Sequence, residues 1–231
     1  MKKTTKMLAI LLAAMTALSG CGGSGTTTTQ TEGKTETTAA AEKTGTETDE
    51  VVTMAVISSW DTLNIYNTSG NYGNAVADQL FERLVTRTHD GVIEPRLATE
   101  WQIADDNKSM TFKLAENALW HDGEKLTAND IVFTCKAMTN PDVDNYYRSA
   151  FNVLAGTDDD GVAADTDQVG VEAVDDYTVK FSFKEPKDQD TILNAFLSFL
   201  YVLPEHILDT GNYADINNSS FWTSPVGAGP F

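Results

Sequence analysis

Cysteine is scarce in this sequence, which holds two in 231 residues, at positions 21 and 135. So few cysteines cannot form a disulfide framework, and their spacing is not that of a zinc site. Cys135 stands in the apolar stretch IVFTCKAM, so we expect it to be a buried small hydrophobic residue and not a reactive thiol. The fold must therefore depend on an ordinary apolar core.

Positive charge is also scarce, with 16 Lys and Arg residues against 34 Asp and Glu residues and a formal net charge of -18. So acidic a chain repels phosphates, which excludes nucleic acid as a partner. The negative charge also disfavours binding of the chain to an anionic lipid surface, so membrane attachment would require an anchor.

Histidine is rare too, and its three residues do not form a visible catalytic set. His121 and Asp122 are neighbours, but adjacent strand residues face opposite ways, and Asp122-Gly123 is typical of a turn. His89 and His206 have no partners at metal-ligand spacing, and the serines lack a nucleophile elbow. We therefore predict no catalytic residues, no metal site, no cofactor and no enzymatic activity.

An acidic loop, Asp158-Asp159-Asp160-Gly161, resembles part of a calcium-binding loop. The EF-hand spacing would need an oxygen ligand at Gly156 and a glutamate at the position of Asp167. We interpret the loop as a solvated acidic surface.

The N-terminus has the pattern of a secretory signal. Basic residues within 2–6 precede an apolar run, 7–18, which is too short to span a bilayer. The residues LSGC at 18–21 resemble the bacterial lipobox. That resemblance implies a signal peptide over 1–20, a diacylglyceryl group on Cys21 and cleavage just before it.

A tether and then a folded body follow the signal. Residues 22–50 contain no aromatic or branched aliphatic side chain, so they cannot offset their chain entropy by burial, and we expect disorder. Such a flexible segment would span roughly 30 Å. The folded body begins near Val51 and contains all four tryptophans.

Residue patterns in the body predict mixed strands and helices. Residues 51–57 are β-branched and apolar, as in a buried strand. Apolar residues at helical spacing predict a helix over 74–85, with Asn74 as its cap. A near-capping box, Thr127 to Asp130, predicts a second helix through Met138.

Two segments alternate apolar and polar residues, which predicts half-buried antiparallel strands. The apolar positions are Met110, Phe112 and Leu114 in the first segment, and Val179, Phe181 and Phe183 in the second. The run 169–174 and the turn-like Asp175-Asp176 make the second strand part of a predicted hairpin.

Several blocks of the body closely resemble the family 5 extracellular solute-binding proteins, the dipeptide, oligopeptide and nickel receptors of ABC importers. The blocks occur in the family's order: LATEW at 97–101, MTFKL at 110–114, WHDGEKLTANDIVF at 120–133, DYTVKF at 176–181, LPEH at 203–206 and PVGAGPF at 225–231. Members commonly carry proline after the Asn or Asp of the first loop, whereas here Ile65 follows Asn64.

The resemblance implies a mixed α/β fold of the periplasmic-binding-protein type II, a bilobed receptor. In the family the PVGAGPF motif opens the return to the first lobe, so we expect this chain to lack the second lobe. The implied division places 51–73 and 224–231 in an incomplete first lobe and 74–223 in a smaller inserted lobe, after the signal at 1–20 and the anchor and linker at 21–50.

The implied function is that of a lipid-anchored receptor on the extracytoplasmic face of a bacterial membrane. It would capture short peptides as a monomer and deliver them to an ABC permease with its ATPase subunits, with Cys21 attaching it to the membrane. Receptors of the same family for nickel, sugar or haem remain alternatives. A surface hydrolase would need a catalytic set, and an adhesive lipoprotein would not need the family blocks.

The loop after the first predicted strand matches the family segment that lines the ligand cleft. Polar residues there could hydrogen-bond to a ligand backbone, the tryptophan could line a pocket, and the aspartate could pair with an amine. An ordinary surface turn is the alternative, because turns favour the same residue types. The candidate ligand-binding residues are Ser58, Ser59, Trp60, Asp61, Asn64 and Tyr72.

Overall fold

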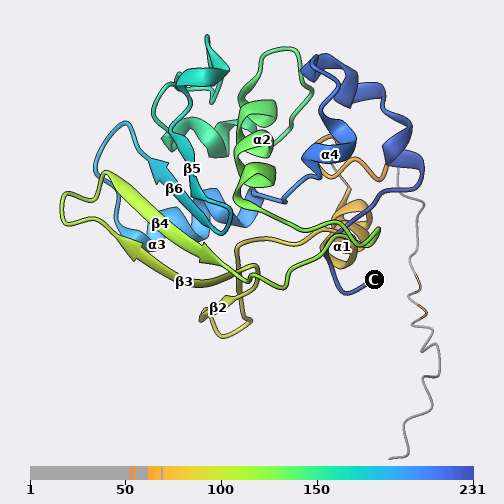
Figure 1. Ribbon diagram of the computed structural model, residues 1–231, viewed down its shortest axis with the longest axis horizontal. Helices are drawn as coiled ribbons and strands as arrows, with labels where there is room; N and C mark the ends of the chain where they lie inside the picture. Colours follow the sequence, from red (N-terminus) through yellow and green to blue (C-terminus); the bar gives the residue numbers. More distant parts are fainter. Residues whose placement is uncertain (1–52, 54, 56–61, 69) are drawn as a thin grey trace, which may run out of the picture. The chain divides into compact units, whose positions relative to one another are not determined.

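A four-stranded antiparallel sheet with one long helix beside it organises the folded part of the chain (Figure 1). The computed structural model describes residues 53, 55, 62–68 and 70–231, all within one unit, Thr53–Phe231. The predicted signal peptide, Cys21, the linker and most of the predicted strand 51–57 lie outside the described residues. Within the described part of the chain, no helix combines the length and apolar character needed to cross a bilayer.

The helices are α1 (Asn71–Leu80), α2 (Ala128–Thr139), α3 (Gln189–Thr191) and α4 (Glu205–Leu208). The strands are β1 (Val85–Arg87), β2 (Ile93–Pro95), β3 (Ala98–Ile103), β4 (Ser109–Leu114), β5 (Val171–Asp175) and β6 (Thr178–Ser182). A π-helical turn spans Ile192–Phe196, and short 3-10 turns span Arg148–Val153, Thr166–Gln168, Leu197–Phe199, Tyr213–Asn218 and Ser220–Thr223.

The main sheet has the strand order β3-β4-β6-β5, and every neighbouring pair is antiparallel. Met110 pairs with Phe181 and Phe112 pairs with Val179, so the apolar positions of β4 and β6 share one face. All four side chains are buried. Both alternating strands and the β5–β6 hairpin predicted from the sequence are confirmed.

Helix α2 begins at the predicted capping box and packs against β5 and β6. The Thr127 amide donates to Asp130 Oδ2 at 2.8 Å, which satisfies an N–H group that the helix itself leaves unpaired. Asp130 Oδ1 accepts from the Glu205 amide at 3.0 Å, so the same carboxylate joins α2 to α4. Burial raises the pKa of Asp130. The helix ends at Thr139, one residue beyond the prediction.

The predicted helix 74–85 is wrong in its bounds. Helix α1 begins at Asn71, after Gly70, and ends at Leu80 because Phe81 adopts an extended backbone. Leu84 and Val85 are buried as expected, but Leu84 directly precedes β1 and Val85 is its first residue. Helical spacing of apolar residues therefore identified the buried positions and not the conformation that buries them.

A series of six aromatic rings runs through the core from the sheet to the turn at residues 64–67. Neighbouring ring centroids lie between 5.4 and 6.3 Å apart. In order, the members of this ring series are Trp101, Phe112, Phe181, Phe196, Phe151 and Tyr66.

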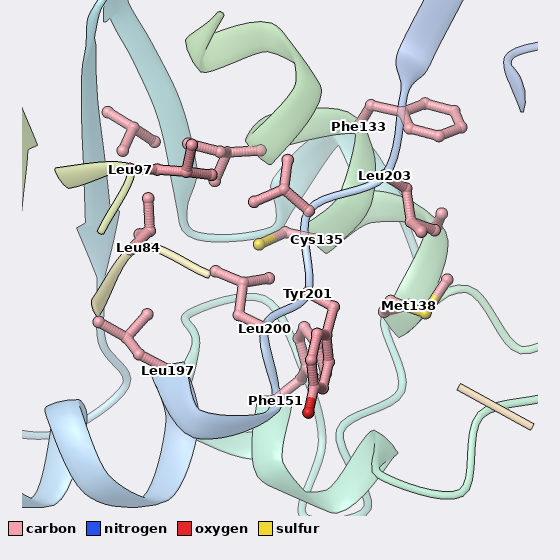
Figure 2. Packing of buried hydrophobic residues seen from close by; sticks show 14 of the residues in the cluster. Leu84, Leu97, Phe133, Cys135, Met138, Phe151, Leu197, Leu200, Tyr201 and Leu203 are labelled. Atoms are coloured by element: carbon pink, nitrogen blue, oxygen red, sulfur yellow. The ribbon is translucent and has the colours of Figure 1, made fainter. Parts of the chain in front are cut away.

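Cys135 lies on α2 inside the core, as the sequence predicted. Figure 2 shows its side chain near buried leucines of the segment that contains Leu197, Leu200 and Leu203. Burial raises the pKa of the Cys135 thiol strongly, which keeps it protonated and inert.

Replacing Asp130 with alanine should destabilise the fold by about 2 kcal/mol, because the amides of Thr127 and Glu205 both lose their acceptor. Urea unfolding followed by circular dichroism measures the change. Asp105→Ala, in an exposed turn, is the matched control and should change stability by less than about 0.5 kcal/mol. Equal stability of the two variants would show that the Asp130 carboxylate does not join α2 to α4.

Candidate functional site

Of the six candidate ligand-binding residues, the structure describes Asn64 and Tyr72. Ser58, Ser59, Trp60 and Asp61 lie outside the described residues. Tyr72 lies half-buried in the first turn of α1.

Asn64 is buried and holds a tight turn at residues 64–67. Its Oδ1 accepts from the Tyr66 amide at 3.0 Å, and its backbone carbonyl accepts from the Asn67 amide at 3.0 Å. An asparagine side chain that bonds the backbone two residues on is a common way to fix a turn. Asn64 Oδ1 thus already accepts a bond from within the turn, and a ligand contact by Asn64 stays a prediction.

Tyr66 anchors this turn in the core. Its ring is the last member of the ring series, and its hydroxyl donates to the Tyr201 carbonyl at 2.7 Å. Complete burial raises the pKa of Tyr66 well above its usual range, so the phenol remains a neutral donor. The turn that follows the predicted cleft loop is therefore held rigidly.

Beside the turn lie three aromatic residues, Tyr146, Tyr147 and Phe199, which we name the aromatic ledge. The Tyr146 amide donates to the Tyr66 carbonyl at 2.9 Å, which joins the ledge to the turn. The rings of Tyr147 and Phe199 stack with centroids 5.0 Å apart and an interplanar angle of 21°. Tyr146 is 64% exposed and Phe199 is 36% exposed, so each of these two side chains presents apolar surface to solvent.

The Tyr147 hydroxyl connects the ledge to α1. It donates to the Thr68 carbonyl at 3.4 Å and lies 3.2 Å from Asn74 Oδ1. Asn74, predicted as a helix cap, therefore lies within the first turns of α1 and contacts the ledge. Hydroxyl contacts at two points fix the orientation of the Tyr147 ring.

A polar cluster fixes the segment that carries Phe199. The Tyr201 hydroxyl donates to Asp78 Oδ1 at 2.6 Å, and Arg83 Nη2 pairs with the same oxygen at 2.7 Å. The Arg83 guanidinium also lies 4.6 Å from the centre of the Tyr201 ring, and its Nη1 donates to the Ser198 carbonyl. Burial raises the pKa of Tyr201. These contacts tie α1 to the residues on either side of Phe199.

Sequence reasoning missed the aromatic ledge. Its members come from two segments that are far apart in the chain, so no local spacing links them. The one available signal was the adjacent pair Tyr146-Tyr147 after the turn-forming stretch NPDVDN, where exposed aromatics are unusual.

The turn at residues 120–123 forms as predicted, with the Gly123 amide donating to the Trp120 carbonyl at 2.9 Å. It also makes a contact that the sequence did not predict. His206 Nε2 lies 2.8 Å from Asp122 Oδ2, although the two residues are 84 positions apart. The hydrogen bond with His206 lowers the pKa of Asp122.

The acidic loop uses its first carboxylate to hold its own turn. Asp158 Oδ1 accepts from the amides of Asp160 and Val162 at 2.9 and 2.8 Å. Across residues 53, 55, 62–68 and 70–231, no three His, Cys, Asp or Glu side chains gather closely enough to hold a metal ion.

Comparison with known proteins places these features in a family. Residues 92–231, more than half of the chain, match the family model "Bacterial extracellular solute-binding proteins, family 5 Middle". The periplasmic murein peptide-binding protein MppA of Escherichia coli is 34% identical over 155 residues, covering 65% of this chain and 27% of MppA. The periplasmic oligopeptide-binding protein OppA of Haemophilus influenzae is 35% identical over 117 residues, covering 49% of this chain and 21% of OppA.

Solved structures agree with the sequence matches. The oligopeptide-binding protein AppA of Bacillus subtilis, in complex with a nonapeptide, has a TM-score of 0.62 at 25% identity, over 75% of this chain and 31% of AppA. NikZ of Campylobacter jejuni, in complex with Ni(L-His), has a TM-score of 0.58 at 27% identity, over 74% of this chain and 30% of NikZ. The chain spans less than a third of each of these four relatives.

The family match and the structural matches assign the chain to the same family, and the expected fold class is confirmed. The mixed α/β body is part of a type II periplasmic-binding-protein fold. The chain belongs to family 5 of the bacterial extracellular solute-binding proteins.

Proposed function

We propose that the chain is part of a lipid-anchored receptor of an ABC importer, which captures short peptides outside the cell and delivers them to a membrane permease. The observation that carries this proposal is the aromatic ledge beside the turn that follows the predicted cleft loop. MppA, OppA and AppA, which are named for murein peptide or oligopeptide binding, support peptide as the ligand.

The ledge suits an extended peptide for a physical reason. Exposed aromatic rings offer a large apolar surface at low entropic cost, and the Tyr147 ring is oriented here by its hydroxyl contacts and by its stack on Phe199. Ser58, Ser59 and Asp61 would add polar contacts to the peptide backbone, and Trp60 would add a wall. We infer that the protein acts by binding a solute and not by catalysis.

We also propose that a second lobe closes over the bound peptide, because enclosing a small ligand requires walls on both sides. In this division, 51–73 and 224–231 belong to the first lobe and 74–223 to the inserted lobe. An insertion requires the chain to enter and leave at neighbouring points. The Gly229 amide donates to the Leu80 carbonyl at 2.9 Å and the Phe231 amide to the Gln79 carbonyl at 3.2 Å, so the second crossing segment lies against α1, the helix that contains the boundary at 73/74.

A receptor for a nickel chelate is the second candidate, because NikZ with bound Ni(L-His) shares the scaffold. Such a ligand also presents a planar imidazole to an aromatic surface. The two candidates differ in whether Ni²⁺ is needed for binding.

Replacing Tyr146 with alanine should weaken peptide binding about fivefold or more, because the most exposed ring of the ledge is lost. NMR titration of the chain with di- to pentapeptides, up to millimolar concentration, measures the affinity and the residues whose signals shift. Val174→Ala, which removes a comparably exposed apolar side chain from β5, is the matched control and should leave the affinity unchanged.

Shifts in the wild-type chain should centre on the ledge and on residues 62–68. Equal affinity of the two variants, or shifts that centre away from the ledge, would contradict the proposal. Binding of histidine at the ledge only when Ni²⁺ is present would instead favour the nickel-chelate receptor.

Replacing Cys21 with serine should release the protein from the membrane, because the acyl anchor needs the thiol. Membrane fractionation with mass spectrometry of the N-terminal peptide measures this. Cys135→Ala keeps Cys21 and should remain in the membrane fraction. Retention of the Cys21→Ser variant at the wild-type level would count against the anchor.

A further inference from the structure

The turn at residues 120–123 contacts a distant segment of the chain, residues 227–229, through both ring nitrogens of His121. The His121 amide donates to the Gly227 carbonyl at 2.9 Å, the Gly227 amide donates to His121 Nδ1 at 3.2 Å, and His121 Nε2 lies 2.9 Å from the Gly229 carbonyl. The segment 227–229 thus meets His121 through three hydrogen bonds.

These partners define the protonation state that the contact needs. A backbone amide can only donate, so His121 Nδ1 must be the acceptor and must carry no proton. A carbonyl can only accept, so His121 Nε2 must carry the proton. The contact is therefore complete only with the neutral Nε2–H tautomer. A proton on Nδ1 would place two donors face to face and remove the bond from Gly227.

The fit of the segment leaves little room to adjust. A side-chain carbon on Gly227 would lie 1.7 Å from the Leu80 carbonyl oxygen and 3.2 Å from His121 Cε1. The segment therefore lies closely between the C-terminal end of α1 and the imidazole. A change in the protonation of the His121 imidazole therefore acts directly on the backbone of residues 227–229.

The other side of the same turn has the opposite dependence on protons. His206 Nε2 contacts Asp122 Oδ2 at 2.8 Å, and this pair gains attraction when His206 is protonated. A proton on the His206 ring would therefore favour the contact of His206 with Asp122, and a proton on His121 Nδ1 would oppose the contact of His121 with Gly227.

The remaining charged groups around the turn do not provide a substitute for the lost bond. Glu124 lies on the turn itself, Asp130 and Glu205 lie on α2 and α4, and both Asp130 and Glu205 interact electrostatically with His206. The end of α1 meets the segment 227–231 through the backbone of the uncharged residues Gln79 and Leu80, and Asp78 on the same helix pairs with Arg83 and Tyr201.

We propose that His121 is an acid-sensitive latch, which holds residues 227–229 on the end of α1 while its ring is neutral and loosens them when Nδ1 is protonated. Histidine as a residue type changes charge between about pH 5 and pH 8, which sets the range over which the latch is tested. If the chain crosses between lobes at this segment, as the proposed function has it, acid would loosen the joint between the lobes.

Amide hydrogen exchange of the intact chain, measured by NMR without any ligand, tests the latch separately from the proposed function. Between about pH 8 and about pH 5, the protection factor of the Gly227 amide, corrected for intrinsic exchange, should fall about fivefold or more. The Gly229 amide, which is bonded to the Leu80 carbonyl, should change less. His121→Phe should give weak Gly227 protection at both pH values.

The other two histidines provide matched controls. His206→Gln removes the ion pair with Asp122 but keeps the imidazole of residue 121, and His89→Gln changes an exposed histidine in the turn between β1 and β2. Both variants should keep the pH response of Gly227. A Gly227 protection factor that is equal at the two pH values in the wild-type chain, or a pH response that survives in His121→Phe, would overturn the proposal.

Discussion

The perpendicular packing of phenylalanine rings around Phe181 is the interaction on which the rest of this structure depends. Phe181 meets Phe112 at 80° and Phe196 at 82°, and Phe196 meets Phe151 at 79°, which is the edge-to-face geometry that aromatic pairs favour. Each such pair adds about 0.5–1.5 kcal/mol to the free energy gained by burial. The series begins in the sheet and ends at Tyr66, so the sheet and the candidate site share one core.

This arrangement explains why the site can be exposed and still be ordered. Tyr66 fixes the turn from inside, and its carbonyl holds the Tyr146 amide, while the Tyr147 hydroxyl fixes the adjoining ring. The backbone of Tyr146 is therefore held by the turn, and the ring of Tyr147 is held by Thr68 and α1. A surface oriented in advance loses less entropy when a ligand binds.

The features that could be predicted from the sequence are those whose determinants lie within a few residues. Alternation over Met110 to Leu114 identified β4, and the Thr127–Asp130 capping box identified the start of α2. The bounds of α1 could not be predicted, because the helical spacing of apolar residues continues past Leu80 whereas the backbone becomes extended at Phe81. The aromatic ledge and the His206–Asp122 pair join distant residues, and only the tertiary fold brings them together.

We propose that the ledge and the adjoining turn form one wall of a peptide site. Photo-crosslinking with a short peptide that carries a benzophenone side chain, followed by mass spectrometry, tests it most directly. The account predicts crosslinks concentrated in residues 62–74, 145–148 and 197–201, which disappear when excess unlabelled peptide is added. Crosslinks spread over the surface, or crosslinks that unlabelled peptide does not remove, would contradict it.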